Sequence, residues 1–281
     1  SYRYAGANPN NYVCFGSDAT TCPEDNLYRI IGVFDGKVKL IKASAASSSL
    51  LGTDGASTYS SGYDNLYYWS TLLSCPSSTS SYISDNSNNV MFVSNRKNIL
   101  AAGDAGVVNY CNLWNYSDLN KINLNTNYLN SIGTKWSKMI ENSVWRISGY
   151  NTSNVVPRAM FTAEITNATK TYGPSDGTSK IGLIYVSDFG FAANPSAWTT
   201  TMDNYKNYND VNWLSSIDTW TITPNSSEEE TVFSLSNGNI YFTGNVAGTG
   251  QKYNAIPAIY LLASVTYVSG SGTMSDPIVI N

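Results

Sequence analysis

The sequence predicts an α+β protein in which strands and helices occupy separate parts of the chain. Strand-like runs gather near both ends, and the clearest helical pattern lies between residues 119 and 140. Asp35-Gly36 and Asn237-Gly238 each join two alternating runs, and both dipeptides tolerate the positive φ of a tight hairpin turn. Because helices and strands do not alternate, the pattern favours α+β over α/β.

The N-terminal part reads as β-hairpins. We expect a strand at residues 10–15, followed by the strongly apolar run LYRIIGVF and the alternating run KVKLIK. Asp35-Gly36 joins the last two runs into a hairpin.

Residues 44–118 are rich in Ser, Gly and Asn. We interpret them as a long ordered insertion, because the runs LYYWSTLL and VMFV within them are too apolar to be solvated; the alternative is a flexible linker. The chain then forms a single domain over residues 1–281. The alternative is a small β subdomain over 1–118 followed by a second domain over 119–281.

One amphipathic helix is predicted in the middle of the chain. Its apolar positions recur at four-residue steps and form one face: Leu124, Tyr128, Ile132, Trp136 and Ile140. Gly133 interrupts this face and is a candidate break, because glycine is a poor helix former.

A second helix is expected over residues 158–167, after Pro157 at a tolerated first-turn position. Its Glu164 is expected to be exposed. A buried strand at 180–186 then leads into a loop, SDFGFAANPSAW, and a further polar loop is expected over 199–212.

The C-terminal part reads as an antiparallel sheet. It contains a short strand around Trp220, the hairpin at Asn237-Gly238 and a nearly all-apolar strand at residues 255–262. Two more short strands flank the Gly/Ser turn near the end of the chain. The last one is expected to pair with an N-terminal strand and bring the termini together.

Composition excludes several classes of function. Charged residues make up 13% of the chain, about half of the usual ~25%. With a net charge of −4 and no basic stripe, the chain is not expected to bind nucleic acid. It contains no histidine, so histidine triads, histidine general bases and histidine metal sites are excluded. A surface of Ser, Thr, Asn and Tyr suits an extracellular protein.

The four cysteines have no zinc-site spacing. Of three possible connectivities we favour local pairing, Cys14–Cys22 and Cys75–Cys111; the alternative is four free buried thiols. Disulfides would indicate an exported protein at the cell surface. The sequence shows neither a run long enough to span a membrane nor a signal peptide, so we expect a mature fragment whose export or anchoring segment is missing.

Three C-terminal runs resemble bacterial C-type-lectin-like domains: DTWT at residues 218–221, VFSLSNGNI at 232–240 and IPAIYL at 256–261. This family includes formylglycine-generating-type enzymes and the variable proteins of diversity-generating retroelements. Ile256 stands where many relatives carry arginine, so a common salt bridge is lost. The chain also resembles surface proteins of gut Firmicutes, in the runs ANPNNYVCFG, LYRIIGVFDGKVKLIK and KIGLIYVSDFGFAA. In such proteins this region often follows a type IV pilin-like N-terminal segment.

The resemblance implies a ligand surface on the loops beside the last strands. Carried over by position, the candidate ligand-binding residues are Trp220, Thr221, Thr223, Asn225, Ser226, Ser227, Glu228, Glu229, Glu230, Tyr241, Thr243, Asn245, Lys252, Tyr253 and Asn254. These side chains are expected to point outward, on the opposite face from Val232, Phe233 and Leu235.

No convincing catalytic set is present, so we do not expect an enzyme. Glu228 to Glu230 are adjacent and read as a charged loop tip. Asp188 lies at a strand end among aromatic residues, where a turn-forming role is the plainer interpretation. Formylglycine-generating activity is excluded, because no cysteine follows Cys111. No cofactor is expected; a structural Ca²⁺ remains open.

The first functional hypothesis is an adhesin-like module that binds a protein or glycan on a cell or matrix surface. The alternative is a structural, pilin-like subunit that assembles into a surface filament. A third hypothesis is a carboxylate-based glycosidase that uses Asp188.

Overall fold

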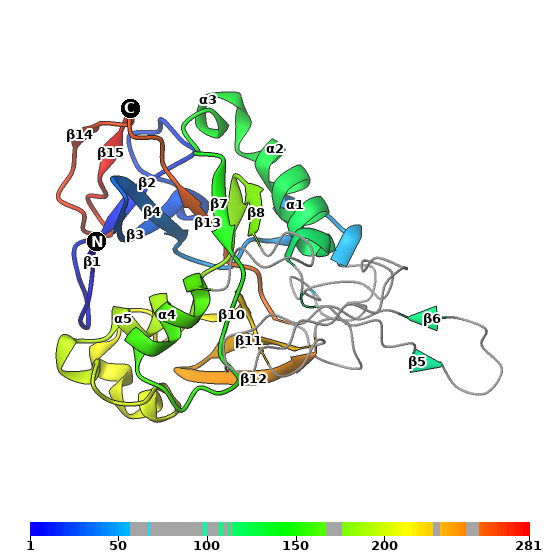
Figure 1. Cartoon of the computed structure of the whole chain (residues 1–281). Helices are drawn as coiled ribbons and strands as arrows, with labels where there is room; N and C mark the ends of the chain where they lie inside the picture. Colours follow the sequence, from blue (N-terminus) through cyan, green and yellow to red (C-terminus); the bar gives the residue numbers. More distant parts are fainter. Residues whose placement is uncertain are drawn as a thin grey trace.

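The computed structural model describes residues 1–56, 67, 98–99, 107–108, 112, 114–166, 176–226, 231–245 and 253–281. It is an α+β structure in which several antiparallel sheets lie beside short helices (Figure 1). The coarse class predicted from the sequence is therefore confirmed.

The largest sheet has six strands and joins both ends of the chain. Its path is β1-β3-β4-β13-β9, and β2 also pairs with β3. The strands are β1 (Tyr2–Arg3), β2 (Tyr12–Cys14), β3 (Leu27–Phe34), β4 (Lys37–Lys42), β9 (Ile181–Gly182) and β13 (Ala258–Tyr260). All of these pairings are antiparallel. A single sheet thus brings residues near positions 2, 40, 182 and 259 together.

The remaining strands form smaller antiparallel sheets. One has the order β10-β11-β12, and the others are the pairs β7–β8, β5–β6 and β14–β15. Their bounds are β5 (Asn98–Ile99), β6 (Val107–Val108), β7 (Ser143–Arg146), β8 (Asp176–Ser179), β10 (Asp218–Pro224), β11 (Thr231–Ser236), β12 (Asn239–Asn245), β14 (Tyr267–Ser269) and β15 (Val279–Ile280). The expected strand at residues 255–262 is regular only over β13.

Both predicted hairpins are confirmed. Asp35 and Gly36 have φ of 50° and 79° between β3 and β4, and Asn237 and Gly238 have φ of 48° and 76° between β11 and β12. Two consecutive positive φ values are the signature of the turn that matches the twist of a β-hairpin.

The central helical stretch forms with two differences from the predicted α-helix. Its first part, η4 (Leu119–Tyr128), is a π-helix, and it continues into α2 (Leu129–Ser131). The helix then breaks at Gly133, whose φ is 80°, before α3 (Gly133–Ser137). The predicted break is therefore confirmed, while the wider π turn was not anticipated.

The second predicted helix is confirmed as α4 (Pro157–Thr166). Two predicted loops are wrong, because they contain helices: α5 (Val186–Ala192) begins within the expected strand at 180–186, and η6 (Met202–Val211) is a 3₁₀ stretch. The backbone N–H of Tyr185 donates to Asp188 Oδ2 at 3.2 Å, which caps the start of α5. The other short helices are η1 (Glu24–Asn26), α1 (Ser48–Leu51), η3 (Trp114–Tyr116) and η5 (Pro195–Ala197).

Two clusters of buried apolar side chains form the core. The first packs the helices from η4 to α3 on the large sheet, with Leu124, Tyr128 and Trp136 among its members. The second lies around α5 and includes Phe189, Met202 and Phe233. Side chains from both clusters line the pocket described below: Tyr185 and Tyr260 from the first and Phe34 from the second.

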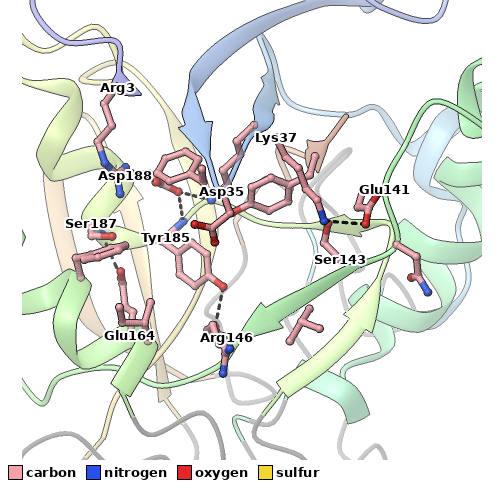
Figure 2. A pocket seen from close by; sticks show the side chains of 17 residues that line it. Arg3, Asp35, Lys37, Glu141, Ser143, Arg146, Glu164, Tyr185, Ser187 and Asp188 are labelled. Carbon is pink, nitrogen blue, oxygen red and sulfur yellow. Dashed lines mark hydrogen bonds and ion pairs between the residues drawn. The ribbon is translucent and has the colours of Figure 1, made fainter. Parts of the chain in front are cut away.

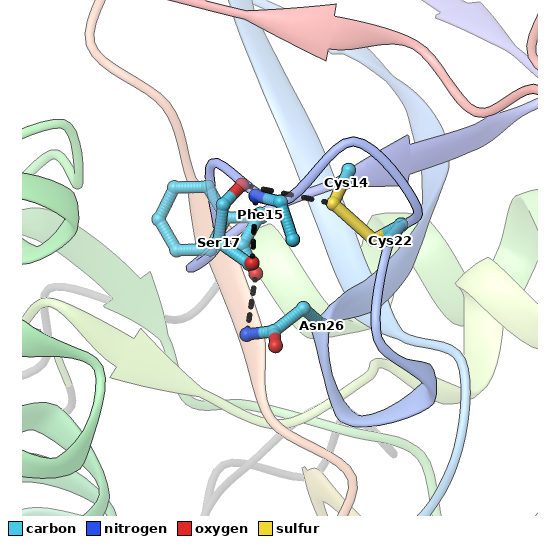
Figure 3. The surroundings of a disulfide bond; sticks show 6 residues. Cys14, Phe15, Ser17, Cys22 and Asn26 are labelled. Atoms are coloured by element: carbon cyan, nitrogen blue, oxygen red, sulfur yellow. Dashed lines mark hydrogen bonds between the residues drawn. A yellow bond between two sulfur atoms is a disulfide. The ribbon is translucent and has the colours of Figure 1, made fainter.

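A disulfide joins Cys14 and Cys22, whose Cα atoms are 5.8 Å apart (Figure 3). Beside this loop, the side chain of Asn26 donates to Phe15 O at 3.1 Å. This pairing confirms one of the two predicted bridges. Cys75 and Cys111 lie outside the described residues, as does most of the 44–118 insertion.

The end of the chain returns to its beginning, as expected. Ile278 N–H donates to Tyr12 O at 2.8 Å, and Cys14 N–H donates to Ile278 O at 2.9 Å. β14 and β15 flank the predicted Gly/Ser turn, and the two termini lie on the same side of the molecule (Figure 1). None of the helices in the described ranges has the length and hydropathy needed to cross a bilayer.

Candidate functional site

A pocket of about 650 Å³ opens between the β3–β4 hairpin, β7, α4 and the start of α5 (Figure 2). Its volume lies within the ~300–1,000 Å³ of small-molecule sites. The lining residues are Arg3, Phe34, Asp35, Lys37, Lys39, Glu141, Asn142, Ser143, Val144, Arg146, Phe161, Glu164, Ile165, Tyr185, Ser187, Asp188 and Tyr260. The wall therefore combines aromatic side chains with acidic and basic ones.

Asp188 is the centre of a buried ion cluster at one side of the pocket. Its Oδ1 accepts from Arg3 at 2.8 Å, and its Oδ2 accepts from Lys39 at 2.5 Å. Burial alone would raise the pKa of Asp188, but Lys39 and Arg3 more than offset this effect and lower it. Asp188 is thus an ionised anchor that joins β1, β4 and α5.

Aromatic rings enclose the two cations of this cluster. The Arg3 guanidinium lies 4.5 Å from the ring centre of Phe34 and 4.6 Å from that of Phe191. Lys39 Nζ lies 4.4 Å from the ring centre of Tyr185. Ring faces attract cations, so they partly replace the water that Arg3 and Lys39 lose on burial.

Glu164 is buried beside the cluster, with an exposed fraction of 1%, so the prediction that it is exposed was wrong. It lies near the end of α4, which packs against α5. Its Oε1 accepts from Thr223 Oγ1 at 2.8 Å and from the backbone N–H of Ser187 at 3.2 Å. Burial raises its pKa to about 7, so a substantial fraction of this carboxyl is neutral at neutral pH.

The opposite side of the pocket carries a second ion pair. Lys37 Nζ lies 2.8 Å from Glu141 Oε1, and both side chains are partly exposed. Ser143 begins β7 next to this pair (Figure 2). The pocket thus has a buried polar side near α5, a more open polar side at Lys37–Glu141, and apolar surface between them.

The candidate residues at the start of the C-terminal sheet do not face outward. Trp220, Thr221, Thr223, Asn225 and Ser226 are all buried. Trp220 Nε1 donates to Tyr67 O at 2.6 Å, and Thr221 Oγ1 donates to Phe233 O at 2.7 Å. The expected alternation fails because both faces of β10 are covered.

Tyr241, on the edge strand β12, is exposed to 44%. Thr243 and Asn245 lie on the same strand. Tyr253 and Asn254 are half-buried, and the Tyr253 ring packs edge-on against Trp220 at 4.7 Å.

Five candidate residues lie outside the described part of the chain: Ser227, Glu228, Glu229, Glu230 and Lys252. Of the candidate residues that the structure describes, none lines the pocket. Thr223 is connected to the pocket indirectly, because its hydroxyl donates to the lining residue Glu164.

The sequence pattern did not indicate that these residues share a pocket. Asp188 and Glu164 were predicted to have a turn-forming and an exposed role, respectively. Their partners Arg3 and Lys39 gave no signal, because positions 3, 39, 164 and 188 share no motif or period. The one hint was Asp188 among aromatic residues at a predicted strand end.

The polar groups of the site differ in how fully they are paired. Both Asp188 oxygens accept from the chain's own donors, so this carboxylate is committed to structure. Among the described residues, no group of three acidic or cysteine side chains could hold a metal ion. What the pocket offers is aromatic surface, hydroxyl groups and one carboxyl of raised pKa.

Comparison with known proteins gives no family assignment. No protein-family model matches the chain, and no match is found among curated proteins or solved structures. The resemblance to C-type-lectin-like proteins therefore stays a prediction.

Proposed function

We propose that this chain is a ligand-binding module with a C-type-lectin-like fold, displayed by an exported, adhesin-like cell-surface protein, and that the pocket at Asp188 is its binding site. The observation that carries the proposal is the pocket itself: a concave site whose polar groups are fixed by a buried ion cluster. Rigid, preorganised polar groups in an apolar cleft are typical of ligand sites. The Cys14–Cys22 disulfide supports export.

The test blocks the pocket without disturbing the core. Val144 lines the pocket and is 53% exposed, so Val144→Trp adds bulk at a wall that faces solvent. Val268, on β14, is 55% exposed and lies outside the pocket lining, so Val268→Trp is the matched control. Binding of labelled protein to cells, matrix proteins and glycans is then measured.

We expect Val144→Trp to weaken binding at least about tenfold and Val268→Trp to leave it unchanged. Equal binding by wild type and Val144→Trp would overturn the assignment to this pocket and return attention to the 220–254 region.

A structural subunit is the second candidate, because one observation favours it. Tyr267, Val268 and Met274 are 65%, 55% and 61% exposed in the C-terminal segment. Exposed large apolar side chains are candidate contacts between proteins. Electron microscopy of the native protein tests this candidate: filaments that are lost in Val268→Asp would support it, and monomers would count against it.

A further inference from the structure

Three buried polar atoms in the pocket wall make no well-formed hydrogen bond among the described residues: Glu164 Oε2, Ser187 Oγ and Ser143 Oγ, although the Ser187 hydroxyl lies near the Glu164 carboxyl. Glu164 and Ser187 are each exposed to 1%, and Ser143 to 8%. Buried polar atoms are nearly always hydrogen-bonded in proteins, so each unpaired group needs an explanation. Three of them around one pocket indicate a site that a ligand completes.

These atoms lie on two sides of the pocket. Ser187 and Glu164 lie together beside Asp188, whereas Ser143 lies across the pocket, next to the Lys37–Glu141 pair (Figure 2). They belong to three different elements, β7, α4 and α5. A ligand that satisfies all of them must therefore carry hydrogen-bonding groups along its length.

The charge of the wall argues for a neutral ligand. Four basic and four acidic side chains line the pocket. Lys37 pairs with Glu141, while Arg3 and Lys39 both pair with Asp188. An ammonium group would meet the cations beside Asp188, and a carboxylate would meet Glu164 and Glu141. Because the four positive and four negative side chains of the wall balance, a charged ligand would lose its hydration without gaining a net counter-charge.

We propose that the pocket binds a neutral, hydroxyl-rich ligand, namely a segment of an oligosaccharide, which pairs with Glu164 and Ser187 at one side and with Ser143 at the other. The proposal deepens the proposed function and rests on it. A sugar hydroxyl donates and accepts at once, so it can donate to Glu164 Oε2 and accept from Ser187 Oγ. The apolar faces of the sugar rings pack on the surface of Phe34, Tyr185 and Tyr260.

The experiment uses a glycan array of neutral oligosaccharides, with sialylated and uronic-acid glycans, free amines and peptides as competing classes. Binding of the best neutral oligosaccharide is then titrated by calorimetry against wild type, Ser187→Ala and Ser143→Ala. Each variant removes one hydroxyl, and we expect each to weaken binding about five- to tenfold.

Ser234→Ala is the matched control. Ser234 Oγ is also buried and unpartnered within the described part of the chain, but it lies on β11 and outside the pocket lining. We expect this variant to bind like wild type. The melting temperature of all three variants is measured, so that a loss of folding is distinguished from a loss of contact.

Two outcomes separate the two proposals. If only charged ligands or peptides bind, and Val144→Trp abolishes that binding, the ligand class is wrong and the pocket assignment stands. If neutral oligosaccharides bind equally to wild type, Ser187→Ala, Ser143→Ala and Val144→Trp, both proposals are overturned. An equal loss in Ser234→Ala would overturn the assignment of the two pocket serines.

Discussion

At the scale of single residues, Glu164 and Asp188 show how burial gives two carboxyl groups opposite properties. Asp188 accepts from two cations and stays ionised. Glu164 accepts from Thr223 and a backbone N–H, and its pKa rises to about 7 because burial outweighs these hydrogen bonds. The same chemical group is therefore an anchor in one position and a titratable group in the other.

Glu164→Gln should remove a pH dependence of stability. Below about pH 4.5 the carboxyl is protonated in both the folded and the unfolded state, and above about pH 7 the folded state must ionise a buried group. The wild-type free energy of unfolding, relative to Glu164→Gln, should therefore fall by about 3 kcal/mol as the pH rises from about 4 to 8. Urea unfolding of both proteins across this range measures it. A difference that stays constant with pH would show that Glu164 titrates alike in both states.

At the scale of elements, two hairpins with the same turn differ in their surroundings. A Cβ atom at Gly36 would meet nothing within 4 Å, because the β3–β4 turn projects freely. A Cβ atom at Gly238 would lie 1.9 Å from Asn209 Oδ1, because η6 packs against the β11–β12 turn. Both glycines are needed for the positive φ of their own turn. Gly238 is needed in addition because Asn209 of η6 leaves no room for a Cβ atom.

Gly36→Ala and Gly238→Ala should therefore differ in stability. Gly36→Ala introduces only the strain of a positive φ, about 1–2 kcal/mol. Gly238→Ala adds the displacement of Asn209 and should cost more. Chemical denaturation of both variants tests this order. Equal losses would mean that Asn209 moves aside without cost.

At the scale of the whole molecule, the large sheet closes the chain on itself. β1, β3 and β4 come from the first 42 residues, and β13 pairs with β4 near the end. This closure holds Arg3 against Asp188 across 185 positions of sequence. The loop closed by the Cys14–Cys22 disulfide is hydrogen-bonded to the C-terminal segment at Ile278. The disulfide therefore stabilises the N-terminal side of this contact.

Loss of the Cys14–Cys22 disulfide is expected to lower the stability of the fold measurably. Replacing both Cys14 and Cys22 by Ser should lower the free energy of unfolding by about 2–3 kcal/mol, because the unfolded chain regains the entropy of a short closed loop. Thermal and chemical unfolding measure the loss. In the wild type, digestion with a protease that cuts before Asp18 should leave two peptides joined by the disulfide. Two separate peptides would contradict the bridge.

The local chemistry of the sequence determined much of the secondary structure. Asp35-Gly36, Asn237-Gly238 and Gly133 were predictable because positive φ is a property of one or two residues. The strands LYRIIGVF and KVKLIK were predictable from their pattern, and the close pair Cys14–Cys22 from its spacing. The helix α5 was missed although Asp188 caps it locally, because its first two N–H groups donate to Thr223 and Glu164, which are far away in the sequence.

Only the tertiary structure decided where the pocket lies. Arg3, Lys39, Glu164 and Asp188 meet because sheet pairing and helix packing bring four separate segments together. The burial of Trp220, Thr221 and Thr223 was decided in the same way, since a strand covered on both faces cannot keep one of them for a ligand. Burial and charge pairing are set by neighbours in space, and they convert an ordinary glutamate and aspartate into the centre of the candidate site.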